Sequence, residues 1–213
     1  MLIGLSGFIG SGKDTIAKYL VETYGFIPLS YASALKDVVS SLFGWDRTKL
    51  EGITPEDREW RNCVDTWWEE RIGIPGLTPR LVLQTIGTDM FRKHFHPDIW
   101  ISVVERKILN LKEQHPECRI IVTDCRFFNE GECIRRLGGQ VIRVERGRPD
   151  HYDCMYKASI GDPTGVNECK QLGIHSSEYS MISFSFDTII HNDGSFEDLY
   201  HTLEHSNLFS NMI

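Results

Sequence analysis

Hydrophobic and polar positions along the chain follow two periodicities that alternate from one segment to the next. Short runs that are almost wholly apolar have the length of buried strands, and we predict strands at residues 2–5, 26–31, 119–124, 140–144 and 184–190. Between these runs apolar residues recur at helical spacing, which predicts helices at residues 14–24, 32–43, 78–95, 98–114, 127–137 and 196–205. Strands that alternate with helices are typical of an α/β domain. Pro28 indicates that the second strand lies at a sheet edge or begins there.

One stretch with little regular pattern, residues 44–79, is rich in charge and in tryptophan. Aromatic rings interleaved with arginines can stack a nucleotide base and clamp a phosphate. Trp67 and Trp68 are candidates for this role. The alternative is that the tryptophans pack the interior of a small helical insertion.

A second stretch, residues 145–178, also has little regular pattern. Irregular segments of this length in a compact domain tend to be functional lids or mobile loops. Arg143, Arg146 and Arg148 stand at its start. A lid with arginines can exclude water and neutralise the charge that develops during phosphoryl transfer.

The glycine-rich stretch of residues 7–13 lies between the first predicted strand and the first predicted helix. It fits the pattern G-x-x-x-x-G-K, in which backbone N–H groups cradle phosphates. Gly10 and Gly12 let the backbone curl, and the helix N-terminus and Lys13 add positive charge. The alternative is a glycine-rich turn that binds nothing, but the strand, the helix and the lysine in this order favour a phosphate site.

The residues after this lysine bear on the class of protein. Asp14 stands where such loops usually have a serine or threonine hydroxyl for Mg²⁺, and Thr15 follows it. Small kinases of the nucleoside monophosphate type tolerate this change, because their Mg²⁺ is held largely through waters and phosphates. Asp14 therefore favours a small kinase over a GTPase or a motor ATPase.

Polar residues follow three other predicted strands. Asp124 ends a buried strand, where it can hold Mg²⁺ through water or orient an arginine, and Arg126 can reach a phosphate. The alternative for these two is a structural pair that caps the next helix. Lys36 lies just beyond the second strand, although its spacing alone fits a solvated lysine equally well. The turn that contains Asn192 follows the last strand, so its backbone could face an adenine.

The composition restricts the partners and the compartment. A length of 213 residues with 41% hydrophobic content suits one α/β domain with a modest insertion. The net charge of −7 and the pI near 5.6 argue against nucleic acid as a partner. The six cysteines form no C-x-x-C pair, no apolar run reaches about 18 residues, and we expect no leader. We therefore expect a cytoplasmic protein with free thiols and no membrane partner, and a homodimer stays open.

Several motifs together resemble those of one family, the deoxynucleoside monophosphate kinases of bacteriophages and other viruses. They occur in family order across nearly the whole chain: G-S-G-K-D-T at 10–15, A-L-K-D at 34–37, L-Q-x-I-G-T-D at 83–89, Trp100, T-D-x-R-F at 123–127, N-E at 129–130, G-G at 138–139, H-x-S-E at 175–178 and N-D-G-S at 192–195. The glycine-rich stretch of residues 7–13, known as a P-loop, occurs in many families and is unspecific alone. The combination of G-K-D-T, I-G-T-D and D-x-R is fairly specific to this family.

The resemblance implies a P-loop NTPase fold, that is, a three-layer α/β fold with a five-stranded parallel sheet, a helical substrate-binding insertion and a lid. The core would comprise residues 1–43, 96–145 and 184–213, the insertion about residues 44–95, and the lid about residues 146–180. The implied cofactors are ATP and Mg²⁺, and the implied acceptor is a deoxynucleoside monophosphate. If the chain is viral, its compartment would be the host cytoplasm.

The family motifs also imply roles for individual residues. The donor phosphate site would consist of Gly10, Ser11, Gly12, Lys13, Asp14 and Thr15, with Asn192 near the nucleotide. Lys36, Arg92, Asp124 and Arg126 would line the acceptor and transfer region, and Glu178 would be a lid residue. Lys13, Asp124 and Arg126 are the expected catalytic residues, and Asp14 and Asp124 would hold Mg²⁺ through water. The insertion and the lid match the family poorly, so the residues that recognise the base cannot be assigned by motif.

These observations predict transfer of the γ-phosphoryl group of ATP to a deoxynucleoside 5′-monophosphate. One alternative is another P-loop small-molecule kinase, which acts on phosphomevalonate or dephospho-coenzyme A. A second alternative, from a different class, is a nucleotide-binding protein without transfer activity. The sequence has no N-K-x-D motif for guanine recognition, which argues against the interpretation as a GTPase.

Overall fold

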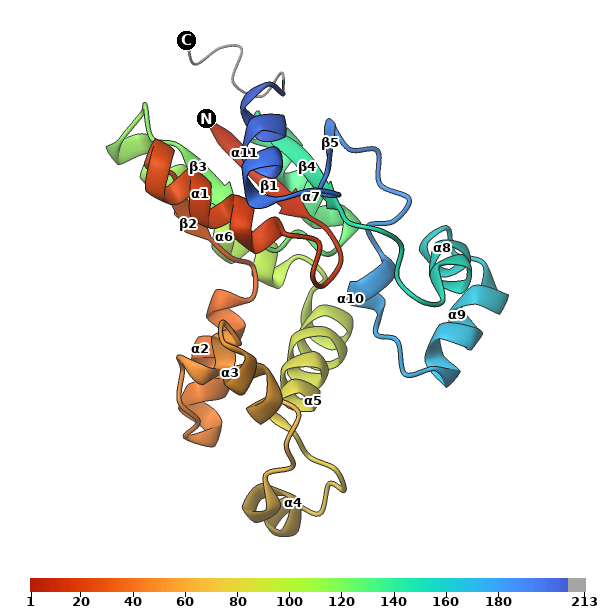
Figure 1. Ribbon diagram of the computed structural model, residues 1–213. Coiled ribbons are helices and arrows are strands. Elements are labelled where there is room, and N and C mark those ends of the chain that lie inside the picture. Colours follow the sequence, from red (N-terminus) through yellow and green to blue (C-terminus); the bar gives the residue numbers. More distant parts are fainter. Residues whose placement is uncertain (207–213) are drawn as a thin grey trace. The chain divides into compact units, whose positions relative to one another are not determined.

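A parallel sheet carries the glycine-rich loop (Figure 1). The computed structural model describes residues 1–206, and the chain divides into two compact units, one formed by residues 1–30 and the chain from residue 105 onward, the other by residues 31–104. The first unit contains five strands in the order β2-β3-β1-β4-β5, every neighbouring pair parallel. Their bounds are β1 (Leu2–Ser6), β2 (Ile27–Leu29), β3 (Ile120–Val122), β4 (Gln140–Glu145) and β5 (Thr188–His191). The predicted five-stranded parallel sheet is confirmed, with β2 and its Pro28 at an edge.

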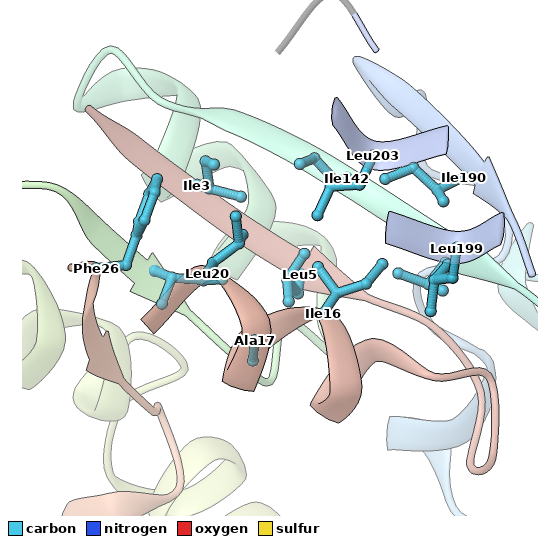
Figure 2. Close-up of a cluster of buried hydrophobic side chains, with 12 residues drawn as sticks. Ile3, Leu5, Ile16, Ala17, Leu20, Phe26, Ile142, Ile190, Leu199 and Leu203 are labelled. Carbon is cyan, nitrogen blue, oxygen red and sulfur yellow. The ribbon is translucent and has the colours of Figure 1, made fainter. Parts of the chain in front are cut away.

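Helices cover both faces of this sheet. On one face α1 (Lys13–Tyr24) and α11 (Phe196–Glu204) bury apolar side chains against the strands (Figure 2). The opposite face is covered by α7 (Phe128–Arg136), since a Cβ on Gly4 of β1 would lie 3.1 Å from Ile134. Successive residues of a strand point to opposite faces, so the sheet lies between two helical layers. The core on the first face consists of Ile3, Leu5, Ile16, Ala17, Leu20, Phe26, Ile121, Ile142, Val144, Ile190, Leu199 and Leu203.

The strand order creates a switch point beside β1. From β1 the chain builds β2 and β3 on one side of it and then β4 and β5 on the other. In open α/β sheets, ligands bind outside the carboxyl ends of the strands at such a point. The glycine-rich loop after β1 and the segment after β3 both begin at this edge.

The segment expected to be irregular, residues 145–178, contains three helices. These are α8 (Tyr152–Ser159), α9 (Pro163–Gln171) and α10 (Ser176–Tyr179). The prediction of little regular structure is wrong here, because short helices with few apolar positions give a weak periodic signal. Asp162 caps α9 by accepting a hydrogen bond from Thr164 N, and Pro163 occupies its first turn. Cys154 of α8 and Cys169 of α9 are buried side by side, with their sulfurs 3.7 Å apart.

The last strand is shorter than predicted and begins later in the chain. The sequence pattern predicts residues 184–190, whereas β5 covers Thr188–His191. Phe184 packs instead against α7, where a Cβ on Gly131 would lie 2.6 Å from its ring. The Arg135 guanidinium lies 4.6 Å from the centre of the same ring. Packing against a helix thus outweighs the strand pattern at this position.

The second unit is helical throughout its regular segments. It contains α2 (Ser33–Phe43), the 3₁₀ turn η1 (Lys49–Glu51), α3 (Pro55–Trp60), α4 (Thr66–Ile72), α5 (Pro79–Gln84), the π-helix η2 (Thr85–Phe95) and the start of α6 (Ile99–Gln114). The single helix predicted for residues 78–95 is therefore an α-helix followed by a π-helix. Trp45 and Trp100 belong to the buried core of this unit, and Trp60 and Trp68 pack against it. None of the helices within residues 1–206 is long and apolar enough to cross a membrane.

Ile142→Ala should lower the free energy of unfolding by about 2–5 kcal/mol, because it leaves a cavity in the sheet core. Ile142 is fully buried on β4, whereas Ile189 on the adjacent strand β5 is 48% exposed. The matched variant Ile189→Ala should lose no more than about 1 kcal/mol. Urea denaturation of both variants measures the difference, and equal losses would contradict this description of the core.

Candidate active site

The glycine-rich loop between β1 and α1 is packed tightly against its surroundings. Gly10 and Gly12 have φ values of 80° and 97°, which side chains disfavour. A Cβ on Gly12 would lie 2.4 Å from Nδ2 of Asn192, and one on Gly7 would lie 2.6 Å from the Val144 carbonyl oxygen. The loop therefore needs glycine at position 7 to approach β4 and at position 12 to approach the turn after β5.

Inside the loop, one polar group is buried without a partner. Within residues 1–206, the Ser11 hydroxyl forms no hydrogen bond, although Ser11 is only 2% exposed. The Ser11 carbonyl, by contrast, accepts a 2.8 Å hydrogen bond from Asn192 Nδ2. Asn192 thus supports the loop from β5, and its contact with a nucleotide stays a prediction. An unsatisfied buried hydroxyl is costly, so the loop is better suited to hold a polar ligand than to remain a plain turn.

Positive charge is concentrated where the loop joins α1. The Lys13 side chain is 12% exposed, and its Nζ lies 3.3 Å from Oδ1 of Asp14, whose side chain is 72% exposed. Both residues, with Thr15, form the first turn of α1, where free N–H groups and the helix dipole favour an anion. Loop, helix end and lysine together form a phosphate-binding arrangement.

The segment after β3 brings two of the expected catalytic residues to the same edge of the sheet. Asp124 accepts a 2.7 Å hydrogen bond from Ser30 Oγ, which orients its carboxylate. Cys125 donates its backbone N–H to the Leu5 carbonyl at 2.9 Å, so this segment continues alongside the end of β1. The Cys125 side chain is buried, and this burial raises the pKa of the thiol. Cys125 is therefore a neutral packing residue rather than a nucleophile.

A buried carboxylate fixes the backbone of Arg126. Glu130 is 1% exposed, and its Oε2 accepts hydrogen bonds from the N–H groups of Arg126 at 2.6 Å and Phe127 at 3.0 Å. Glu130 is not among the predicted site residues, although a glutamate at the third position of a helix is a known capping signal. The Arg126 Nη1 donates to Oε1 of Glu178 on α10 at 3.3 Å. Arg126 thus connects the end of β3 to the segment expected to be a lid.

Some of the residues described above line one cleft in the first unit. It lies beside the first half of the glycine-rich loop, and its charged lining residues are Lys13, Arg126, Arg143 and Glu178. The structure therefore brings together three predicted site residues and adds Arg143. Within the described residues, three cationic side chains face the cleft against one carboxylate, and this balance suits a polyanionic ligand.

The second unit holds the other predicted substrate-binding residues. Lys36 pairs with Glu51 at 2.5 Å, and Arg47 pairs with the same carboxylate. Burial would raise the pKa of Glu51, but the hydrogen bonds and charges of Lys36 and Arg47 outweigh it and lower the pKa. The acceptor role of Lys36 stays a prediction.

The remaining candidates of this unit differ in exposure. Arg92 lies in the π-helix η2 and donates to the Pro97 carbonyl at 3.4 Å. Trp67 is 62% exposed, whereas Trp68 is partly buried and donates its indole N–H to the Phe43 carbonyl at 3.1 Å. Trp68 thus helps to hold the unit together, and Trp67, whose ring contacts that of Trp68 edge to face, remains largely exposed. Substrate binding by these residues stays a prediction.

The two carboxylates expected to hold Mg²⁺ lie in segments that follow strands of the sheet. Asp14 follows the loop and Asp124 follows β3. Mg²⁺ typically uses one or two carboxylates, keeps several waters and takes its other ligands from substrate phosphates. Within residues 1–206, no three His, Cys, Asp or Glu side chains form a cluster that could hold a metal ion. The carboxylates thus suit a metal that arrives with a phosphate ligand, and their role stays a prediction.

Comparison with known proteins identifies the family. The model of the deoxynucleotide monophosphate kinase family matches residues 75–156. A protein of Acanthamoeba polyphaga mimivirus assigned to these kinases is 31% identical over 208 residues, which are 94% of this chain and 92% of the relative. The deoxynucleoside-5′-monophosphate kinase of Escherichia phage T5 is 27% identical over 183 residues, which are 63% of this chain and 72% of the relative.

Among solved structures, the dephospho-CoA kinase of Campylobacter jejuni is similar with a TM-score of 0.43 at 16% identity, over 94% of this chain and 92% of that chain. The resemblance that the sequence motifs indicated is confirmed by the sequence relatives, above all by the mimivirus protein, which matches nearly the full chain. The chain belongs to the deoxynucleotide monophosphate kinase family and is a phosphotransferase with a phosphate group as acceptor.

Proposed function

We propose that the chain transfers the γ-phosphoryl group of ATP to the 5′-phosphate of a deoxynucleoside monophosphate and forms ADP and the deoxynucleoside diphosphate. One observation carries most of this proposal: the cleft beside the glycine-rich loop is lined by Lys13 and Arg126, which lie in segments that follow two different strands, β1 and β3. The names of the mimivirus and phage T5 relatives support the acceptor class. The buried, unpartnered Ser11 hydroxyl supports a ligand in the loop.

The proposed mechanism requires alignment and charge compensation rather than a general base. An acceptor phosphate is already a nucleophile at neutral pH, and the charge on the transferred group must be neutralised as bonds form and break. The loop N–H groups and Lys13 would bind the donor phosphates, and Arg126 would neutralise the transferred group. Mg²⁺, held through water by Asp14 and Asp124, would supply further charge compensation.

For the rest of the chain we propose the division that the family implies. Residues 44–95 would be the substrate-binding insertion and residues 146–180 the lid, within one kinase domain whose last residues, 207–213, lie outside the described part. Lys36 and Arg92 would bind the acceptor, the exposed ring of Trp67 would stack on its base, and Trp68 would support it. The family motif at residues 86–89 lies in the π-helix η2, and π-helical turns are frequent at functional sites.

A coupled assay of ADP release tests the acceptor class. We expect turnover with ATP-Mg²⁺ and one or more of dAMP, dCMP, dGMP and dTMP, and weaker turnover with the ribonucleotides. Turnover only with phosphomevalonate or dephospho-coenzyme A would replace the proposed acceptor. ATP binding without turnover on any acceptor would favour a nucleotide-binding protein.

Lys13→Ala should lower kcat by on the order of 10²-fold or more, because it removes a charge from the donor phosphates. Lys18→Ala is the matched control, since Lys18 lies on the same helix, with a side chain that is 74% exposed. Steady-state kinetics on both variants measure the effect, and circular dichroism checks the fold. Near-normal turnover of the folded Lys13 variant would refute the assignment of the loop.

Arg126→Ala should lower kcat more than it raises the KM for either substrate, since Arg126 is proposed to act on the transferred group. Arg119→Ala is a suitable control: Arg119 precedes β3 at the opposite end and donates to the Tyr24 carbonyl at 3.0 Å. Full kinetics with both substrates separate the two parameters. A rise in KM alone would reassign Arg126 to substrate binding.

A further inference from the structure

Arg143 is a charged residue in the buried middle of a strand. It lies in β4, where Val141, Ile142 and Val144 are fully buried, and Arg143 itself is 5% exposed. In the sheet register it pairs with Ser6, the last residue of β1 before the glycine-rich loop. A guanidinium stays charged in proteins, so its burial is costly unless its charge and its N–H groups find partners.

The contacts of Arg143 satisfy its charge but leave most of its donors unused. Nε lies 2.7 Å from Oε1 of Glu145, but it forms no hydrogen bond. Nη1 donates to the Met181 carbonyl at 3.4 Å, which is a long hydrogen bond and the only one that this side chain makes within residues 1–206. An arginine has five N–H donors, so most of the donors of Arg143 form no hydrogen bond.

Arg135 is an arginine of the same chain with a structural role, and its hydrogen bonds can be compared with those of Arg143. Its guanidinium lies over the ring of Phe184 at 4.6 Å, just as that of Arg143 lies over the rings of Phe8 and Phe186. Unlike Arg143, it donates two hydrogen bonds to the carboxylate of Asp187, at 3.3 and 3.1 Å, and another to the Ser185 carbonyl. An ion pair and a ring contact are therefore not enough to explain why Arg143 keeps its donors free.

The free donors of Arg143 lie at the cleft beside the glycine-rich loop. Arg143 lines this cleft with Lys13 and Arg126, and Glu178 is its single carboxylate among the described lining residues. We propose that Arg143 is a third cationic ligand, which binds phosphoryl oxygens of the nucleotide in this cleft together with Lys13 and Arg126. The proposal rests on the function proposed above and adds a binding residue to it.

The surroundings of Arg143 suit this role. Its guanidinium lies 5.0 Å from the ring centre of Phe8, in the loop, and 5.2 Å from that of Phe186. Rings that contact a guanidinium exclude water from it and leave the donors at its edge available. Electrostatic attraction to phosphate is stronger where water is excluded. Glu145 lies against Nε and offsets the cost of burial, and it leaves the two Nη groups available to a ligand.

The test compares Arg143→Met with Arg135→Met. Isothermal titration with inorganic tripolyphosphate and Mg²⁺ measures binding directly, without any acceptor. We expect the Arg143 variant to bind about tenfold or more weakly, since it loses charged hydrogen bonds to the ligand. The Arg135 variant should bind within about twofold of the wild type, although its thermal midpoint should fall. Kinetics with ATP should show the same difference between the two variants.

The outcomes separate this inference from the proposed function. If the wild type phosphorylates no deoxynucleotide, while tripolyphosphate binding still depends on Arg143, the inference stands and the proposed function fails. Wild-type affinity in Arg143→Met, or an equal loss in Arg135→Met, overturns the inference even if the chain is an active kinase. If Arg143→Met does not fold, Arg143→Gln, which keeps polar donors without the charge, should show the same loss of affinity, and wild-type binding by this variant overturns the inference.

Discussion

The close packing of the glycine-rich loop against two neighbouring segments is the constraint on which the rest of the site depends. Gly7 leaves no room for a Cβ beside the Val144 carbonyl, and Gly12 leaves none beside Asn192. These contacts fix the loop to β4 and to the turn after β5, so the loop amides are held before any ligand arrives. Preorganised donors stabilise developing charge without a cost of reorganisation during the reaction.

From this fixed loop, the charges of the site follow from the order of the strands. The neighbours of β1 are β3 and β4, so Arg126 and Arg143 reach the same cleft from the strands on either side of β1. Carboxylates hold them there: Glu130 binds the backbone of Arg126, Glu178 accepts from its side chain, and Glu145 pairs with Arg143. Repulsion among the three cations is thereby reduced, and the net positive charge remains directed at a ligand.

The segment expected to be a lid is connected to the same site through the side chains of Arg126 and Arg143. Glu178 of α10 accepts from Arg126, and the Met181 carbonyl accepts from Arg143. Phe8 of the loop packs against the small apolar core that α8 and α9 share. Glu178 and Met181 thus link α10 and the residues after it to the two arginines of the cleft.

The sequence by itself determined the features that depend on contiguous residues: four of the five strands to within about two residues, the glycine-rich loop with Lys13 at its end, and Asp124 and Arg126 after the third strand. Local periodicity and glycine chemistry are enough for these. Only the tertiary structure decided that Phe184 packs on α7 rather than in β5, that residues 145–178 form helices, and that Arg143 and Glu178 meet at one cleft. Such contacts join residues far apart in the chain, and their energy comes from packing across the whole sheet, which no local pattern encodes.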